Sequence, residues 1–576
     1  MKNATHYIAV LATLFFFATG CKDSFLEVPP TGALEEPQLA TKEGIEGSLT
    51  ASYAVLTGRH GSYTGASNWF WGSILGGDAN KGSNSGDQAQ MNEVQRYATL
   101  GTNVSLASKY RSCYEGIVRA NTVLSLLSKT SQPIPDADKK RMAGEARFLR
   151  GHYFFELKKI FNNTPYIDEN TGKATVKNDK DLWPKIEADF QFAYDNLPEK
   201  TDLVGRANKW AAGAYLAKTY LYQGKDNKGK VNQEKYAAAK RVFDEVIANG
   251  KTSSGVKYAL MPKYGDLFRL ATSDNNQESI FQIQTAVNTG SGANNLADFG
   301  LNFPYGSSAP GGCCGFFQPS FELVNSFRTN ADGLPLLDGS YNTERDEVKS
   351  DYGIAAASAF TPDAGNLDPR LDHSAGRRGI PYLNWGEHPG QTWIRDQPYA
   401  GPYAPKKFMM AKGDIVEGGK MFANNFPIIR YADVLLMAAE AEIELGGLEK
   451  AREYVNLIRR RAANTAGFVT KDDGTPAANY RTGEYSTSWT DPELARKAVR
   501  FERKLELSGE GHRFFDLVRW GIAKETLDAY LAYEGKRLTV AFGGATFTAD
   551  KCEYQPIPQA EIDIVGADNL IQNKNY

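Results

Sequence analysis

Cysteine and histidine are scarce in this chain of 576 residues, which has five cysteines and six histidines. With Cys21 set aside at the end of an N-terminal leader, only Cys113, Cys313, Cys314 and Cys552 remain, too few and too scattered for a disulfide framework. Cys313 and Cys314 are adjacent, which excludes the usual CxxC metal spacing. Two alternatives stay open for that pair: a vicinal disulfide, or two buried reduced cysteines.

The chain also lacks an excess of charge of one sign, since its formal net charge is -2. Phosphate binding leaves a basic footprint that composition would reveal, so we expect no nucleic-acid partner. The HExxH and GxSxG motifs are absent, and Gly250-Lys251-Thr252 lacks the upstream glycine of a P-loop because residue 245 is Glu. We therefore expect no enzyme, although 68 acidic residues do not exclude the paired carboxylates of a glycosidase.

No long apolar run is present either. The apolar stretch at residues 7–17 is shorter than the ~20 residues that a spanning helix needs. Lys2 precedes it and small residues lead into Cys21, which is typical of a signal peptide. Cys21 resembles the acylated cysteine of a bacterial lipobox, although residue 18 is Ala where Leu is usual. Cleavage without lipidation is the alternative.

From this leader we predict a signal peptide over residues 1–20, a lipid on Cys21, and a tether over residues 21–40. One acyl chain binds a membrane only marginally, whereas several chains on one cysteine anchor a protein stably. Lys22 and Asp23 directly after the cysteine resemble the acidic export signal of surface lipoproteins, with an ordinary polar linker as the alternative. With that signal, the prediction is an outer-membrane protein that is lipid-anchored and faces the cell surface.

Both flanks of the chain carry apolar residues at helical spacing. Stripes at residues 111–127, 141–161, 210–222 and 236–248 predict helices within an N-terminal scaffold, residues 41–270. The last two form a tetratricopeptide-like pair in which small alanines face each other.

The C-terminal flank repeats this pattern. Stripes at residues 434–445 and 448–462 flank the turn Gly446-Gly447 and predict a helical hairpin. Stacked hairpins bury a continuous core that one hairpin cannot, and we expect about four pairs. The predicted fold class is mainly α, a tetratricopeptide-like helical-pair scaffold with an irregular, loop-rich ligand-binding region and few short strands.

The middle of the chain, residues 271–430, is rich in Gly, Pro, Asn, Asp and aromatics and lacks a sustained helical period. Residues 278–284 predict one short strand. Loops on a rigid scaffold are where binding residues concentrate, so this region and a loop around residues 66–90 are the expected ligand sites.

Several motifs of the second half occur in one order that resembles the SusD/RagB family. They are Arg430-Tyr431-Ala432-Asp433 with the helix that follows, Asn456-Leu457-Ile458-Arg459-Arg460-Arg461-Ala462, Arg503-Lys504-Leu505-Glu506-Leu507, Gly511-His512-Arg513-Phe514-Phe515-Asp516-Leu517-Val518-Arg519-Trp520, and Pro556-Ile557-Pro558. Residues 431–576 are then the C-terminal hairpin and signature region of one compact unit. We expect Arg430, Asp433, Arg503, Glu506, Arg513 and Asp516 to form ion pairs and caps, with Asp433 as the N-cap of its helix.

The resemblance implies a cell-surface glycan-binding lipoprotein without catalytic activity. Such a protein captures an oligosaccharide or polysaccharide and delivers it to a SusC-like TonB-dependent transporter of the outer membrane. The alternatives are a peptide-binding subunit of a peptide importer and a helical docking scaffold. No cofactor is implied, and whether a structural calcium ion is present stays open.

Sugars combine apolar C–H faces with hydroxyls, so loops that mix aromatic and polar side chains suit them. Three stretches qualify. The stretch at residues 69–80 offers an aromatic platform beside polar groups, and core packing of its tryptophans is the alternative. The stretch around Cys313 and Cys314 offers a rigid apolar bump if the disulfide forms. The stretch at residues 377–403 adds arginine side chains that can donate to adjacent hydroxyls. The candidates are Trp69, Trp71, Asp78 and Asn80; Cys313 and Cys314; and Arg377, Arg378, Tyr382, Trp385, Tyr399 and Tyr403.

Overall fold

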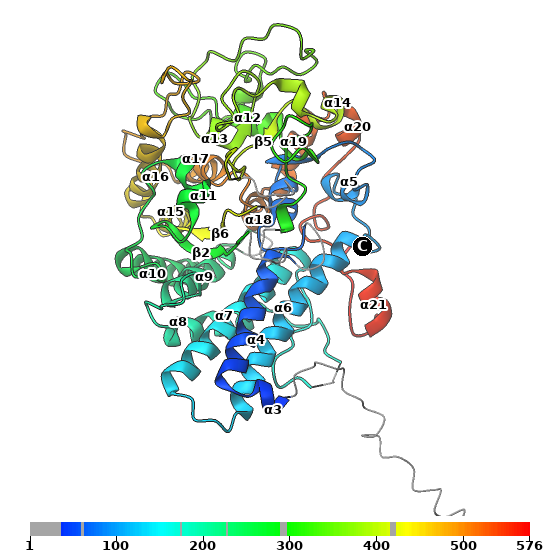
Figure 1. Cartoon of the computed structure of the whole chain (residues 1–576), viewed down its shortest axis with the longest axis vertical. Coiled ribbons are helices and arrows are strands. Elements are labelled where there is room, and N and C mark those ends of the chain that lie inside the picture. Colours follow the sequence, from blue (N-terminus) through cyan, green and yellow to red (C-terminus); the bar gives the residue numbers. More distant parts are fainter. Residues whose placement is uncertain (1–35, 59–62, 173–174, 226–228, 288–296, 415–421) are drawn as a thin grey trace, which may run out of the picture.

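The computed structural model describes residues 36–58, 63–172, 175–225, 229–287, 297–414 and 422–576. Most of its regular structure is helical (Figure 1). The longer helices are α4 (Lys42–Ala54), α6 (Val104–Lys129), α7 (Asp136–Phe161), α8 (Trp183–Asn196), α9 (Lys209–Tyr222), α10 (Gln233–Asn249), α15 (Tyr431–Glu444), α16 (Leu448–Ala462), α17 (Pro492–Glu506) and α19 (Ala523–Glu534).

Shorter helices lie between and after these. They are α3 (Glu36–Leu39), α5 (Gln90–Gln95), α11 (Leu270–Ser273), α12 (Phe321–Ser326), α13 (Leu371–Ser374), α14 (Gln397–Ala400), α18 (Arg513–Arg519), α20 (Thr539–Phe542) and α21 (Gln559–Val565). Single turns are η1 (Val55–Thr57), the π-helical η2 (Trp69–Ile74), η3 (Tyr264–Phe268), η5 (Ala297–Phe299), η6 (Ser340–Asn342), η7 (Gly390–Trp393) and η8 (Thr465–Gly467).

The helices predicted from apolar stripes are confirmed as α6, α7, α9, α10, α15 and α16. Helix α16 has the predicted bounds, and the other five begin earlier than predicted. Asparagine caps explain several of the starting points. The side chains of Asn103, Asn208 and Asn232 each accept a hydrogen bond from a backbone N–H in the first turn of α6, α9 and α10. Such a bond satisfies one of the free donors at a helix start.

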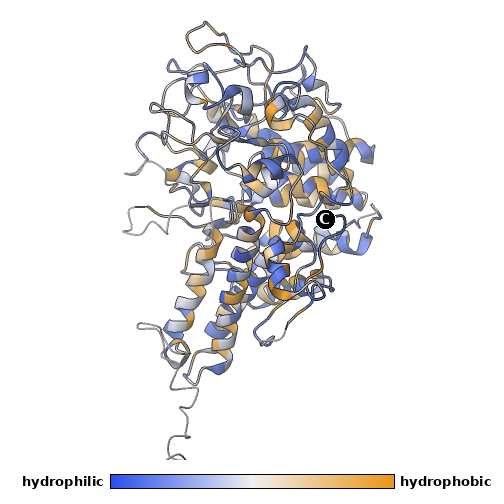
Figure 2. Ribbon diagram, turned by 90° about the vertical axis from the view of Figure 1, so that its right-hand side faces the viewer, coloured by the Kyte–Doolittle hydropathy of each residue, from blue (hydrophilic) through white to orange (hydrophobic). Residues whose placement is uncertain are grey.

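The helices stack in order as neighbours: α4, α6, α7, α8, α9, α10, α15 and α16, with α17 against the last two. Read in twos, these eight helices make four pairs, in line with the tetratricopeptide-like expectation. Helix α15 is central, since every residue from Ala432 to Glu444 is buried. A helix that is buried all round belongs to the core of a large array. In Figure 2 the helices carry both hydrophobic and hydrophilic segments, as expected when one face packs inward.

The loop-rich region lies over one end of this array, at the top of Figure 1. Its strands are short: β1 (Ala79–Gly82), β2 (Ser279–Ile283), β3 (Phe316–Pro319), β4 (Ala375–Gly376), β5 (Ala404–Pro405) and β6 (Phe426–Arg430). They form three antiparallel pairs, β1 with β3, β2 with β6, and β4 with β5. The strand predicted at residues 278–284 is confirmed as β2, and its partner β6 leads directly into α15.

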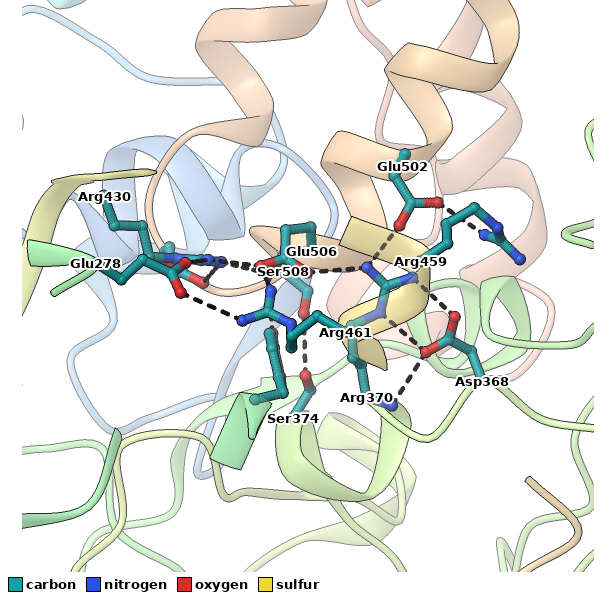
Figure 3. Close-up of polar contacts among 12 residues, drawn as sticks. Glu278, Asp368, Arg370, Ser374, Arg430, Arg459, Arg461, Glu502, Glu506 and Ser508 are labelled. Carbon is teal, nitrogen blue, oxygen red and sulfur yellow. Dashed lines mark hydrogen bonds and ion pairs between the residues drawn. The ribbon is translucent and has the colours of Figure 1, made fainter. Parts of the chain in front are cut away.

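A buried ion network ties these parts together (Figure 3). It has five cations and five anions, each with a side chain no more than 4% exposed. Equal numbers of opposite charges are what make such burial tolerable. The members are Arg370, Lys407, Arg430, Arg459, Arg461, Glu278, Asp368, Glu502, Glu506 and Glu510.

Glu506 lies at the centre of this network. Its carboxylate accepts from Arg430 at 2.5 Å, from Arg370 at 2.9 Å, and from Arg461. Burial alone would raise the pKa of Glu506, but the charges of Arg461, Arg430 and Arg370 outweigh it and hold that pKa well below its usual range. The network therefore joins α16, α17, the end of β6 and the loop before α13.

The predicted ion pairs of the motif residues are confirmed for Arg430 with Glu506, and for Arg503 with Asp433 at 2.8 Å and Asp516 at 3.0 Å. The prediction that Asp433 caps its helix is wrong. Helix α15 begins at Tyr431, so Asp433 lies inside the first turn, where its carboxylate faces Arg503 instead of a free backbone N–H.

Candidate functional site

The two tryptophans of the first predicted stretch lie in the core. Trp69 and Trp71 are both 0% exposed. The indole N–H of Trp69 donates to the Asp298 carbonyl at 2.9 Å, and that of Trp71 to the Tyr63 carbonyl at 2.8 Å. A ring with no exposed face cannot stack on a sugar, so these side chains hold η2 in place. The core alternative weighed above describes them.

The polar residues after them are also buried. Asp78 Oδ2 accepts from the Gly509 N–H at 2.9 Å, and Asn80 Nδ2 donates to the Ala400 carbonyl at 2.7 Å. Burial raises the pKa of Asp78 to about 6. Asp78 borders a small pocket of about 20 Å³, enough for one water. Both residues therefore pack the base of β1 and β3 and do not face solvent.

Four residues of the third stretch are internal as well. Arg377 pairs through two nitrogens with the Asp372 carboxylate, and it is 3% exposed. Tyr382, Tyr399 and Tyr403 are 0%, 4% and 1% exposed. The Tyr399 hydroxyl, for example, donates to Asn92 Oδ1 at 2.6 Å. These side chains therefore pack inside the loop-rich region and its short helices and do not face solvent.

Arg378 and Trp385 remain near the surface. Arg378 donates to the carbonyls of Ala356 and Ser358, both at 2.6 Å, and so closes an exposed loop. Trp385 is half-buried at the turn of a hairpin, and its indole N–H donates to the Met410 carbonyl at 3.1 Å. Among the aromatic candidate residues of the first and third stretches, Trp385 is the one that is not fully buried.

Cys313 and Cys314 form a vicinal disulfide, which decides between the two alternatives left by the sequence. Both cysteines are half-buried in the loop before β3. This loop runs beside Tyr305 and Gly306: a Cβ on Gly315 would lie 3.4 Å from Tyr305 Cβ, and a Cβ on Gly312 would lie 3.9 Å from the Gly306 carbonyl oxygen.

Beside the disulfide, the structure gathers an aromatic ring and a charged pair on one surface. Tyr305 is 36% exposed. The Arg395 guanidinium carbon lies 5.3 Å from the centre of the Tyr305 ring. Arg395 Nη1 donates to Asp87 Oδ2 at 2.5 Å. We call Asp87, Tyr305, Cys313, Cys314 and Arg395 the Tyr305 surface.

Backbone geometry holds three distant segments together here. Antiparallel pairing of β1 with β3 brings Gly82 opposite Phe316, and the Ser83 N–H donates to the Gly315 carbonyl at 2.5 Å. Gly82 has a φ of +83°, and a Cβ on it would lie 2.3 Å from the Gly315 carbonyl oxygen, so only glycine fits this close approach. The Tyr305 N–H donates to the Trp393 carbonyl at 2.9 Å, which brings the third segment alongside.

The chemistry of this surface is that of recognition. Tyr305 offers a partly open ring, Arg395 offers guanidinium donors, and the Asp87 carboxylate offers acceptors, with side chains of Arg395 and Asp87 30% and 28% exposed. Because these opposite charges lie in contact, the pair presents little net charge to a ligand. Such a combination suits a polyhydroxyl ligand with apolar faces.

Of the five residues of the Tyr305 surface, the sequence predicted Cys313 and Cys314 as candidate ligand residues but not the other three. Asp87 falls in the predicted loop 66–90 and Arg395 in the third stretch, yet neither is among the candidate residues. Tyr305 was missed. A signal was available, because Tyr305 is an aromatic residue within the short Pro304-to-Ser308 run of turn-forming residues.

Two further expectations concern other parts of the chain. Cys21, with the predicted signal peptide and most of the tether, lies outside the described residues. Within the described ranges, no group of three or more His, Cys, Asp or Glu side chains is arranged to hold a metal ion. Over the same residues, no helix is both long and apolar enough to cross a bilayer.

Two protein-family models match this chain. The model of the SusD family matches residues 277–576, which is over half of the chain. The chain belongs to the SusD family. A second family model, described as starch-binding and associating with the outer membrane, matches residues 55–221. The two matches together include α6 to α8, all but the last residue of α9, α15 to α17 and most of the loop-rich region, whereas α4 and α10 lie outside them.

Relatives within the SusD family align over most of their length. SusD-like protein P2 of Formosa agariphila is 25% identical over 545 residues, covering 91% of this chain and 92% of the relative. Starch-binding protein SusD of Bacteroides thetaiotaomicron is 25% identical over 466 residues, 77% and 75% of the two chains. Among solved structures, surface glycan-binding protein A from Bacteroides thetaiotaomicron in complex with laminarihexaose has a TM-score of 0.63 at 22% identity, covering 93% of this chain and 99% of that one. That likeness shows the shared fold.

Proposed function

We propose that this protein is a cell-surface glycan-binding lipoprotein that captures an oligosaccharide or polysaccharide at the Tyr305 surface. The observation that carries the proposal is the partly exposed Tyr305 ring, flanked by the Arg395–Asp87 pair and the Cys313–Cys314 disulfide. The ring and the disulfide offer apolar contacts for the C–H face of a sugar, while Arg395 and Asp87 offer a donor and an acceptor for its hydroxyls.

The relatives support the same class of ligand. One relative is named for starch binding, and one solved structure of the same fold holds laminarihexaose. On this proposal the bound glycan is not cleaved but passed to a partner, a SusC-like TonB-dependent transporter in the outer membrane. A lipid on Cys21 would hold the protein beside that partner, facing the cell surface.

Affinity electrophoresis tests capture. Residues 22–576 are run through native gels that contain plant, microbial or host glycans, and the same mixtures are assayed for released reducing ends. We expect retardation by at least one glycan without release. Release of sugar would show catalysis, and retardation by none would favour the peptide-import or docking alternatives.

Variants of Tyr305 then locate the site. Tyr305→Ala should raise the dissociation constant about tenfold, since truncating an aromatic anchor typically costs more than ~1 kcal/mol. Tyr305→Phe keeps the ring and should bind nearly as the parent does. Trp385→Ala tests the other partly open ring. Loss of binding in Trp385→Ala alone, with far-ultraviolet circular dichroism unchanged, would move the site to that hairpin.

Anchoring and delivery need separate measurements. Mass spectrometry of the N-terminal peptide should find acyl chains on Cys21, and Cys21→Ala should release the protein from outer-membrane fractions. Detergent-solubilised outer membranes should yield a TonB-dependent transporter that co-purifies with the tagged full chain. Co-purification of no such transporter would refute the delivery step while leaving capture intact.

A further inference from the structure

Lys81 is a buried lysine directly beneath one edge of the Tyr305 surface. Its side chain is 0% exposed, and its ammonium lies 5.1 Å from the Tyr399 ring centre and 5.8 Å from that of Phe316. A lysine is rarely fully buried unless its ammonium is paired. The Lys81 ammonium donates hydrogen bonds to two backbone carbonyls, and both belong to one short loop.

That loop, residues 83–87, connects β1 to α5 and carries Asp87. Lys81 Nζ donates to the Asn84 carbonyl at 2.7 Å and to the Asp87 carbonyl at 2.6 Å. Between these two points, Asn84 Oδ1 accepts from the N–H groups of Gly86 and Asp87. The loop therefore folds over the ammonium, which supplies charge-assisted hydrogen bonds to its near and far ends.

The position of Asp87 depends on this arrangement. Its carboxylate accepts from Ser83 Oγ at 2.9 Å and from Arg395 Nη1 at 2.5 Å, and Arg395 in turn lies over the Tyr305 ring. Arg395 Nη1 also donates to Ser83 Oγ at 2.8 Å, so both partners of this guanidinium nitrogen belong to the 83–87 loop and move with it. Lys81 thus acts on the exposed surface without touching a ligand.

We propose that Lys81 is a positioning residue whose charged ammonium holds the 83–87 loop, and that loss of its proton loosens the loop and weakens ligand binding. This inference rests on the proposed function of the Tyr305 surface for its effect on binding, but not for its effect on the loop.

Burial places the titration of the Lys81 ammonium at mildly alkaline pH. Burial is the main effect, and the pKa of Lys81 is lowered to about 8. The Arg395 guanidinium adds to this lowering, whereas the Asp87 carboxylate opposes it. Burial raises the pKa of Tyr399, the other titratable group that faces the ammonium, well above its usual range, so Tyr399 stays neutral. The folded loop therefore loses its cation as the pH rises from 7 to 9.

Lys406 provides a matched control. It is also a buried lysine, 2% exposed, with an ammonium that donates to the Pro381 carbonyl at 2.6 Å and lies 5.6 Å from the Tyr382 ring centre. Lys406→Met therefore removes a similarly buried lysine side chain without touching the 83–87 loop.

Amide hydrogen exchange of the full mature chain, measured without ligand, is the first readout. At pH 7, Lys81→Met should speed exchange of peptides covering residues 83–88 about tenfold, the loss expected when hydrogen bonds to a charged group are removed. Lys406→Met should leave those peptides unchanged. Equal exchange in Lys81→Met and the parent would overturn the proposal.

Binding of laminarihexaose and of soluble starch is the second readout. The parent should lose affinity between pH 7 and 9, whereas Lys81→Arg, whose charge persists, should show a flat profile over that range. Parallel profiles for the parent and Lys81→Arg would refute the pH dependence. If neither probe binds the parent, glycan capture at this surface fails for these sugars, while hydrogen exchange still decides the role of Lys81.

Discussion

Replacing Glu506 with glutamine would take one negative charge from a buried network that holds five cations and five anions. The Glu506 side chain is 0% exposed, and it contacts the guanidinium groups of Arg370, Arg430 and Arg461. Glutamine is almost the same size, so the change leaves an uncompensated positive charge and little cavity. Breaking a buried pair in this way typically costs about 3–5 kcal/mol. That is a large part of the ~5–15 kcal/mol by which folded proteins are stable.

The free energy of unfolding is measured by urea denaturation, followed by far-ultraviolet circular dichroism and extrapolated to zero denaturant. The matched control is Glu484→Gln. Glu484 pairs with Arg460 on the adjacent face of α16, but these side chains are 40% and 49% exposed. An exposed pair contributes about 0–1 kcal/mol, so this control should be nearly neutral.

A double variant sharpens the test. Adding Arg461→Met to Glu506→Gln restores equal numbers of charges, so the combined loss should fall short of the sum of the single losses by about 0.5–3 kcal/mol. The reasoning would be refuted if Glu506→Gln lost no more stability than Glu484→Gln, or if the losses of Glu506→Gln and Arg461→Met simply added.

Three further predictions concern stability. Burial raises the pKa of Glu534 to about 8, so between pH 4.5 and 8 the folded chain keeps a proton that the unfolded chain releases. The free energy of unfolding should therefore fall by up to ~1.4 kcal/mol per pH unit as the pH rises through this range. Glu534→Gln should flatten this slope when urea denaturation is repeated at several pH values. Trp71→Ala should cost about 3–5 kcal/mol, because a fully buried indole is lost. Gly72→Ala should destabilise strongly, since the new Cβ would lie 1.9 Å from the Gly511 carbonyl oxygen, whereas Gly47→Ala, with open space in α4, should stabilise by up to ~1 kcal/mol.

Each of these has a contrary result. An unchanged pH profile in Glu534→Gln would mean that Glu534 is ionised when folded. A Trp71→Ala variant as stable as the parent would place that ring outside the core. A Gly72→Ala variant with the stability of Gly47→Ala would show that η2 and the segment around Gly511 can separate freely.

Hydrophobic periodicity made the helical array predictable. Apolar stripes located α6, α7, α9, α10, α15 and α16 because a helix that packs on one side needs apolar residues every three to four positions. The short alternation before residue 284 located β2. The cap assigned to Asp433 failed because the sequence did not reveal that β6 runs straight into α15, which moves the helix start to Tyr431.

The candidate site was predictable only as a region. Aromatic residues in loops serve the core and the ligand surface equally well, and composition does not separate the two uses. Trp69 is buried against the rings of Phe299 and Phe317, and its indole N–H donates to the Asp298 carbonyl, 229 positions away. Tyr305, in contrast, is 36% exposed. The residues next to Trp69 and Tyr305 in the sequence do not reveal which of the two rings is buried.

By itself, the sequence determined the local and the inherited features of this protein: where helices form, which motifs place it in the SusD family, and how its charges balance. The tertiary structure decided which aromatic rings face solvent, that Cys313 and Cys314 are joined, and that Asp87 meets Arg395 across 308 positions of chain. The physical reason is range. Helix hydrogen bonds and caps act within about four residues, whereas burial and ion pairing depend on segments that only the complete fold brings together.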